Sequence, residues 1–285
     1  MDLTSCFRFS FAAAFVLSAC GGNPPEPAAA PSSTAPAASG SAAAAVGATA
    51  PAAGGDQVSA PHIRAAVTAA DRDPEDMKLD AGRHPGALLE FCGIQPGMKV
   101  AEIAAATGYT TELLARAVGP SGTVYGVNNK FIIEKFADKP WAARLAKPVN
   151  KNIVRVDREF DDPLPAEAKG LDVVVDNLFY HDTYWMKTDR DKMNKVIFNA
   201  LKPGGVYCVA DHSGRAGTGA TEVKTLHRIE EKTLREDIEK AGFKLGQEGS
   251  FLKNPADARD WNTAPFAAAD KRGTSDRFVL KFVRP

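Results

Sequence analysis

The stretch from Met98 to Asn128 constrains the fold of this chain more than any other. It begins with a short apolar run that ends near an acidic residue, Glu102, and continues through a turn of small residues, Ala104–Gly108. An amphipathic segment follows, which stops at Gly119-Pro120, and a second β-branched run then completes the stretch. A strand, a turn, a helix and a strand within about thirty residues match the size of one βαβ unit.

We expect the turn between the first strand and the helix to bind a ligand. A parallel strand pair needs a right-handed crossover, so the turn lies at the carboxyl edge of the sheet, where open α/β folds bind ligands. Small side chains there let a ligand approach the backbone, and the first amides of the helix point toward it. The pattern therefore predicts a ligand site at Ala104–Gly108.

These residues resemble motif I of the class I S-adenosylmethionine (SAM) dependent methyltransferases, in which an acid ends the first strand and a glycine-rich turn follows. Glu102 holds the acidic position and Gly108 that of the last glycine, whereas Ala104 and Ala106 stand where glycines are usual. Because alanine disfavours positive φ and adds a methyl group, we expect negative φ at both alanines and a turn farther from the cofactor. A dinucleotide-binding fold is the competing interpretation, but its three glycines at fixed spacing are absent from this sequence.

The rest of the chain continues the alternation of strands and helices. The segments "ALKPGGVY" from Ala200 and "EKAGFKL" from Glu239 are also similar to the superfamily, so the resemblance covers Leu88–Pro285. It implies an α/β fold with a Rossmann-like doubly wound seven-stranded sheet, in the order 3-2-1-4-5-7-6 and with the last strand antiparallel. The residue pattern after the fifth strand predicts one long helix over Thr221–Ala241.

Within the superfamily the chain is most similar to a group of predicted bacterial methyltransferases that often have export signals. The shared segments are "YHD", "DHS", "HRI" and "FLKNPAD", which stand here at residues 180–182, 211–213, 227–229 and 251–257. This group is defined by sequence. The resemblance therefore implies the fold and SAM as the cofactor, but no substrate.

The resemblance also implies which residues bind the cofactor. Glu102 and the turn would hold the methionyl end of SAM, Asn128 at the end of the second strand would accept from the ribose hydroxyls, and Asn177 would face the methyl group. Asp161 is the candidate for the adenine amine, with Asp162 and Phe160 as open alternatives. The full predicted set is Glu102, Ala104, Ala106, Gly108, Tyr109, Asn128, Asp161 and Asn177.

The acceptor side follows from the order of the strands. Strands one, four and five are neighbours, so their carboxyl ends share one rim, on which His181, Asp182, Asp211 and His212 should converge. Methyl transfer depends mainly on positioning, and a base is needed only if the acceptor must lose a proton, a role that suits either histidine. The predicted catalytic residues are Tyr180, His181, Asp211 and His212.

Two structural alternatives stand beside this interpretation. Both rim histidines could simply hydrogen-bond loop backbones, and two histidines with two carboxylates could hold a divalent metal. Neither pair has helical ligand spacing, so we predict no metal. We expect His227-Arg228 to lie on a solvated or sheet-bracing face of the helix.

The N-terminus has the pattern of an export signal. An apolar stretch ends in Leu17-Ser18-Ala19-Cys20, which resembles the lipobox of bacterial lipoproteins, in which the cysteine is lipidated. We therefore predict a signal peptide over 1–20, a disordered Ala/Pro/Gly/Ser tether over 21–60 and the methyltransferase-like domain over 61–285. We expect the lipid anchor to be the only membrane attachment. No acidic residue directly follows Cys20 as a retention signal, so we predict that the protein lies on the periplasmic face of an outer membrane.

Charge and cysteines complete the expectations. With 35 basic and 35 acidic residues the net charge is zero, which argues against nucleic acid as a partner. Cys92 and Cys208 have no close spacing, and we expect two buried thiols rather than a disulfide.

Taken together, these features predict a SAM-dependent methyltransferase acting on a small molecule or an envelope component, with acceptor and oligomeric state open. The alternative is an exported lipoprotein that keeps the fold as a non-catalytic ligand-binding module.

Overall fold

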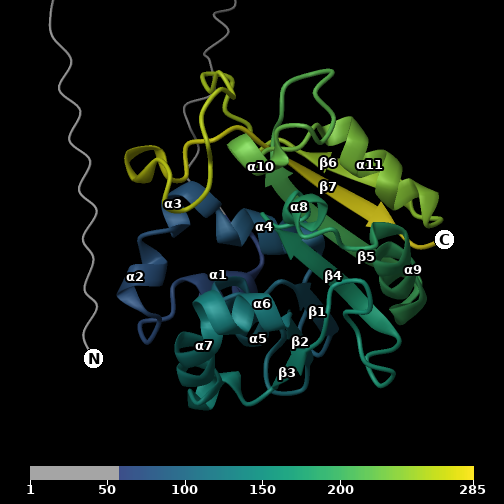
Figure 1. The fold of residues 1–285 in the computed structure, drawn as a ribbon. Coiled ribbons are helices and arrows are strands. Elements are labelled where there is room, and N and C mark those ends of the chain that lie inside the picture. Colours follow the sequence, from purple (N-terminus) through teal and green to yellow (C-terminus); the bar gives the residue numbers. More distant parts are fainter. Residues whose placement is uncertain (1–57) are drawn as a thin grey trace, which may run out of the picture. The chain divides into compact units, whose positions relative to one another are not determined.

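A computed structural model describes residues 58–285 of the chain (Figure 1). The predicted lipidation site Cys20 and the tether up to residue 57 lie outside the described residues. Within 58–285, no helix combines the length and the apolar character that crossing a bilayer requires.

The core of the fold is one sheet with the strand order β3-β2-β1-β4-β5-β7-β6. Strand β7 runs antiparallel to both β5 and β6, and the other pairs are parallel. This confirms the predicted α/β, doubly wound topology. The strands are β1 Lys99–Ile103, β2 Thr123–Asn128, β3 Ile153–Asp157, β4 Leu171–Asn177, β5 Leu201–His212, β6 Lys244–Gly249 and β7 Arg277–Val283.

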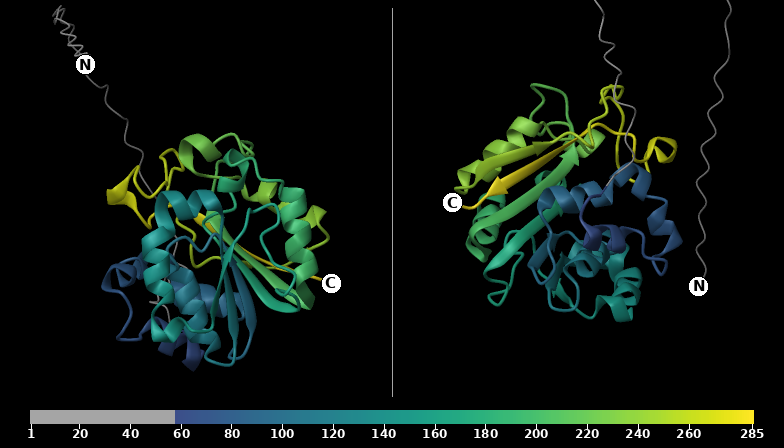
Figure 2. Two further views of the ribbon diagram at one scale, coloured as in Figure 1. Left: turned by 60° about the horizontal axis from the view of Figure 1, so that its bottom comes forward. Right: turned by 180° about the vertical axis from the view of Figure 1, so that it is seen from behind.

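Helices pack on both faces of the sheet (Figure 2). Val100 of β1 belongs to an apolar core shared with α1, α4 and α5, whereas its neighbour Ala101 belongs to the core shared with α9 and α11, as the alternation along a strand requires. The helices are α1 Pro61–Val67, α2 Pro74–Met77, α3 Asp80–Arg83, α4 Pro85–Cys92, α5 Tyr109–Val118, α6 Lys130–Ile132, α7 Asp138–Leu145, α8 Asp182–Trp185, α9 Arg190–Ala200, α10 Val223–Leu226 and α11 Glu231–Lys240. A π-helical turn, η1 Ile133–Ala137, and two 3-10 turns, η2 Pro148–Asn150 and η3 Ala269–Lys271, complete the elements.

The single helix predicted over Thr221–Ala241 is wrong. The structure has two helices there, α10 and α11, because His227 takes a left-handed conformation (φ 49°) that ends α10. Two residues later, Ile229 forms a bridge with Ser213, which directly follows β5. The chain between the two helices therefore pairs with the residue that follows the carboxyl end of β5.

The prediction of two free thiols is also wrong, since Cys92 and Cys208 form a disulfide with their Cα atoms 5.6 Å apart. Cys92 is the last residue of α4, and Cys208 lies in the middle of β5. Packing of α4 across the sheet brings the two buried sulfurs together. Their separation of 116 residues gave no sign of this in the sequence.

Candidate active site

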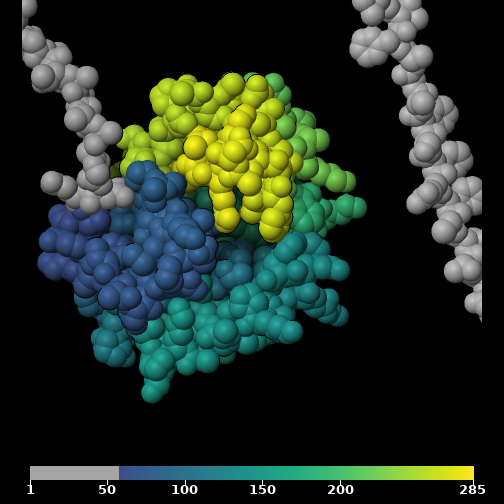
Figure 3. All heavy atoms as spheres, turned by 90° about the vertical axis from the view of Figure 1, so that its left-hand side faces the viewer, coloured from purple at the N-terminus to yellow at the C-terminus, as the bar shows by residue number. Residues whose placement is uncertain are grey.

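The carboxyl ends of β1, β4 and β5 form the rim that the sequence predicted. The register pairs Ile103 with Asp176 and Asn177 with Ala210, so these three strands end at the same edge. Figure 3 shows one face of the described residues, which is hollowed between the yellow segment near the C-terminus and the blue and teal segments. The blue and yellow segments touch, since a Cβ atom on Gly82 of α3 would lie 2.7 Å from the Gly273 Cα.

The turn after β1 takes an unusual backbone path. Ala104 (φ 57°) and Ala106 (φ 49°) are both left-handed, as is Gly108 (φ 85°), so the expectation of negative φ at the alanines is wrong. A non-glycine residue pays on the order of 1 kcal/mol or more for this conformation. The backbone therefore follows a path that normally requires glycine, although two of the glycines are absent.

Asn128 at the end of β2 explains how Ala106 is held in this conformation. Its side chain is fully buried, its Oδ1 accepts from the Ala106 N–H (2.8 Å), and its Nδ2 donates to the Ala106 carbonyl (3.0 Å). The neighbouring Ala105 N–H donates to the Val127 carbonyl (2.8 Å). The amide of Asn128 thus ties the turn to β2, and its contact with a ribose stays a prediction.

Gly108 is required by the packing around it as well as by its φ. A Cβ atom there would lie 2.3 Å from the ring of Trp141 in α7 and 2.5 Å from Cδ of Arg144. Tyr109, the next residue, starts α5 with its hydroxyl donating to Asp80 (2.7 Å) and its ring against the Arg83 guanidinium (4.5 Å). The predicted cofactor residue Tyr109 therefore faces α3.

Glu102 is a buried carboxyl beneath the turn. It is only 3% exposed, and its Oε2 accepts from the hydroxyl of Thr111 in α5. Burial raises the pKa of Glu102 to about 7, although the hydroxyl of Thr111 and the charge of Arg83 oppose the rise. At neutral pH this carboxyl is therefore close to its ionisation midpoint and responds to a nearby positive charge.

The remaining predicted cofactor residues have separate surroundings. The Asn177 Nδ2 donates to the Thr110 hydroxyl (3.2 Å), which joins the end of β4 to the start of α5. Asp161 forms a partly exposed ion pair with Lys192 (3.4 Å). Of the alternatives to Asp161, Phe160 is buried in the core and Asp162 pairs with Arg158. The adenine contact of Asp161 stays a prediction.

The structure brings His181 and Asp211 together, as predicted. The Asp211 Oδ1 lies 2.7 Å from the His181 Nδ1, and its Oδ2 accepts from the His181 backbone N–H (2.8 Å). Burial opposes the charged ring, but the carboxylates of Asp211 and Asp182 outweigh it and raise the pKa of His181 well above its usual value. The end of β5 therefore fixes the position of this ring and favours its charged form.

Of the other two predicted catalytic residues, His212 lies against this pair, with its ring edge-on to that of His181 (centroids 5.8 Å apart), whereas Tyr180 does not. The His212 Nδ1 is 2.8 Å from the Ser275 hydroxyl, and burial holds the pKa of His212 well below its usual value, so its ring is neutral. The phenol oxygen of Tyr180 accepts from the Asn194 Nδ2 (2.8 Å) within the apolar core. The structure does not bring the Tyr180 hydroxyl to His181.

His227 is the residue that the sequence reasoning misplaced. Its Nδ1 lies 3.0 Å from the His181 Nε2 and 3.2 Å from the Asp182 Oδ1. We expected a helix face here, but α10 ends one residue earlier and His227 turns toward the rim. Its neighbour Arg228 is fully buried, pairs with Asp257 (2.9 Å) and donates to the Ser213 carbonyl next to β5 (3.1 Å). The sheet-bracing alternative is therefore right for Arg228, and the solvated one is wrong for it. The sequence analysis singled out the "HRI" segment, but the helical pattern of the residues around it led us to place His227 on a helix face.

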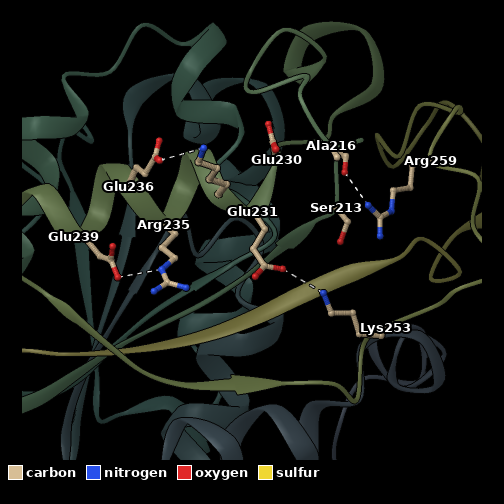
Figure 4. Close-up of a pocket in the computed structure, with 11 residues that line it drawn as sticks. Ser213, Ala216, Glu230, Glu231, Arg235, Glu236, Glu239, Lys253 and Arg259 are labelled. Atoms are coloured by element: carbon tan, nitrogen blue, oxygen red, sulfur yellow. Dashed lines mark hydrogen bonds and ion pairs between the residues drawn. The ribbon is translucent and has the colours of Figure 1, made fainter.

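A separate cavity of 510 Å³ lies alongside α11 (Figure 4). The charged groups that line it pair with one another, as in Lys253 with Glu231 (3.2 Å) and Arg235 with Glu239 (3.1 Å). Such paired, solvated side chains do not converge on a common point, and the rim is the better candidate site.

Comparisons with known proteins show the family and the fold of the chain. A family model described as "Methyltransferase domain" matches residues 94–254. The ubiquinone/menaquinone biosynthesis C-methyltransferase UbiE of Pasteurella multocida is 30% identical over 44% of each chain, and that of Shewanella halifaxensis is 27% identical over 61% of each. The chain thus spans about half the length of the curated relatives that it matches.

Solved structures with the same fold include proteins of different activity. A SAM-dependent methyltransferase from Aquifex aeolicus superposes with a TM-score of 0.52 at 17% identity, covering 75% of this chain and 94% of its own. The [4+2]-cyclase SpnF superposes with a TM-score of 0.50 at 17% identity, covering 72% of this chain and 82% of its own. At these identities the likeness shows the fold, which is the Rossmann-like methyltransferase fold.

Proposed function

The chain belongs to the methyltransferase-domain family, whose model matches more than half of its length, and on that premise we propose that it transfers a methyl group from SAM to a small molecule or to a component of the cell envelope. The observation that carries this proposal is the turn after β1. Ala104 and Ala106 take the left-handed backbone that glycine adopts most readily, in the turn that directly follows the strand of the buried Glu102. The comparisons give no support to a non-catalytic ligand-binding module.

The residues at this turn fit the cofactor. SAM, when bound, supplies a methyl group on a positively charged sulfur. Glu102 would hold the charged methionyl end in its ionised form, and the backbone of Ala104–Gly108 would approach it closely. Because the pKa of Glu102 is about 7, a cation at this place favours loss of its proton. Asn177, fixed by Thr110, would border the methyl group.

The acceptor side of the proposal rests on the ends of β4 and β5. Methyl transfer needs the acceptor atom in line with the bond that breaks, so fixed walls matter more than acid–base chemistry. Asp211 holds both the ring and the backbone of His181, which makes this part of the rim rigid. The UbiE relatives are named for ubiquinone and menaquinone biosynthesis, so quinone-like ring compounds are the first acceptors to test.

We also propose that the protein belongs to the group of exported methyltransferases and is anchored in the bacterial cell envelope by a lipid on Cys20. The Cys92–Cys208 disulfide supports it, because disulfides persist in oxidising compartments and are rare in the cytosol. Growth with radiolabelled palmitate tests the anchor. Label should enter the wild type and not the Cys20→Ser variant, and label in the variant would refute the lipobox.

Calorimetric titration of SAM and of its demethylated product into the full-length protein tests the cofactor site. We expect micromolar binding that weakens at least about tenfold in Glu102→Gln, since a neutral amide loses a charge-assisted contact. Glu239→Gln, which removes a carboxylate of α11 that pairs with Arg235, serves as the control and should bind like the wild type. Absence of binding up to millimolar SAM would contradict the proposal.

A further inference from the structure

Three side chains converge on one point at the rim. The proposed methyl transfer assigns no role to the two ring nitrogens and the carboxylate oxygen that meet there. The His181 Nε2 lies 3.0 Å from the His227 Nδ1, and the Asp182 Oδ1 lies 3.2 Å from each of these nitrogens. His181 comes from the segment before α8, Asp182 starts α8, and His227 follows α10. Two segments that are distant in the sequence, residues 181–182 and His227, therefore place three potential ligand atoms in a triangle of nearly equal sides.

The three atoms lie close enough to share either a ring proton or a metal ion inside this triangle. The His181 Nδ1 already faces Asp211 at 2.7 Å, which directs the Nε2 toward the other two atoms. A ring N–H of one histidine can donate to either of the other two atoms. A metal ion instead accepts a lone pair from all three at once, which is the arrangement that the converging atoms offer.

The dimensions suit a transition metal. Zinc binds imidazole nitrogen and carboxylate oxygen at about 2.0–2.2 Å, so two ligands of a tetrahedral site lie roughly 3.3 Å apart. The observed sides of 3.0 and 3.2 Å are close to this value. The side chain of His181 is 3% exposed, and those of Asp182 and His227 are 21% and 24% exposed, so the triangle has one buried side and one that an ion can reach.

Further contacts orient each of the three groups. Asp211 behind His181 forms the carboxylate–histidine pair that commonly supports a metal ligand, and the Trp185 Nε1 donates to the Asp182 Oδ1 (2.5 Å). The left-handed backbone of His227 is braced by the Thr263 hydroxyl, which donates to the His227 carbonyl (2.7 Å). Strained backbone of this kind persists only where the surroundings impose it, and it clusters at functional sites.

We propose that His181, Asp182 and His227 bind one divalent transition-metal ion of the zinc type. Two nitrogens and one carboxylate leave a fourth position open, which is the pattern of catalytic rather than structural zinc sites. His212 is not part of the set, because its Nδ1 faces Ser275. If the proposed function holds, the open position lies on the acceptor side and would take an oxygen of the methyl acceptor, so hydroxyl-bearing acceptors are the expected class.

Metal binding can be tested without SAM, so its outcome is independent of the methyltransferase assay. The full-length protein is stripped with a chelator and titrated with zinc chloride in a calorimeter. We expect one ion per chain with micromolar or tighter affinity, and a cobalt(II)-substituted protein with the visible absorption of a four-coordinate site. Binding that is absent at pH 8, or that exceeds one ion without saturation, would overturn the proposal in favour of a protonated cluster or of surface binding.

Matched variants locate the site. His227→Asn removes the ring while keeping a residue that tolerates the left-handed backbone, and Asp182→Asn keeps the shape of the side chain. Each should weaken zinc binding at least about 100-fold, and Asp211→Asn, which acts through His181, about 10–100-fold. His62→Gln is the control, since its ring contacts the Ile94 carbonyl (2.8 Å) and should not affect binding. Equal loss in His62→Gln, or unchanged binding in His227→Asn, would place the metal elsewhere.

Discussion

The buried carboxyl of Glu102 makes a quantitative prediction about the pH dependence of stability. Burial raises its pKa from 4.5 to about 7 in the folded protein, whereas in the unfolded chain it keeps its ordinary value. Between these two pH values the folded state retains a proton that the unfolded state has lost, so stability falls as pH rises. This loss of folding stability amounts to about 3 kcal/mol. It is absent below pH 4.5, where the carboxyl is protonated in both states, and complete above pH 7, where it is ionised in both.

Replacement of Glu102 by glutamine removes this penalty, because the amide does not ionise. Urea unfolding of the full-length wild type and Glu102→Gln at several pH values between 4.5 and 8 measures it, since the difference between the two proteins cancels the other titrating groups. We expect the variant to gain about 3 kcal/mol relative to the wild type over this range.

The control for this experiment is Glu239→Gln, whose carboxylate is partly exposed on α11. Its difference from the wild type should stay within about 0.5 kcal/mol across the same pH range. The difference in free energy of unfolding between the wild type and Glu102→Gln could instead stay constant with pH, or the wild type could gain stability relative to the variant as pH rises. Either result would mean that Glu102 is ionised in the folded protein. The burial argument would then be refuted.

Three further predictions concern the turn and the disulfide. Gly108→Ala should lower the free energy of unfolding by about 3 kcal/mol in urea melts, because its Cβ meets the Trp141 ring. Gly93→Ala, which has the same left-handed backbone but open space around it, should cost only about 1 kcal/mol. Ala106→Gly should stabilise the protein by about 0.5–1 kcal/mol by relieving positive φ; a loss of stability would argue against the strain. Reduction of the Cys92–Cys208 bridge should cost about 4 kcal/mol, and unchanged thermal unfolding under reductant would contradict the assignment.

The sequence predicted the fold because its signals are local. Alternating apolar runs, the acid at Glu102 and the turn at Ala104–Gly108 define the first βαβ unit, and the handedness of parallel crossovers then restricts the topology. The same rule predicted that His181 and Asp211 would meet, since it brings the ends of neighbouring strands together.

The features that the sequence did not predict depend on contacts between distant residues. The conformation of Ala106 is imposed by hydrogen bonds from Asn128, and no property of alanine itself indicates it. His227 was assigned to a helix face because the residues around it have helical propensity, which a strained turn and the contact with the sheet edge overrule. In each case tertiary packing decided a local conformation.

The disulfide has a consequence for the order in which the protein matures. The bridge between Cys92 and Cys208 closes a covalent ring that contains β1, β2, β3 and β4, together with the turn above Glu102. A chain that is exported as an unfolded thread can close this ring only after its arrival, with electrons passed to an oxidant at the destination. If the proposed export holds, the bridge forms in the envelope, whereas in a reducing cytoplasm Cys92 and Cys208 stay thiols and α4 is held against β5 by packing alone.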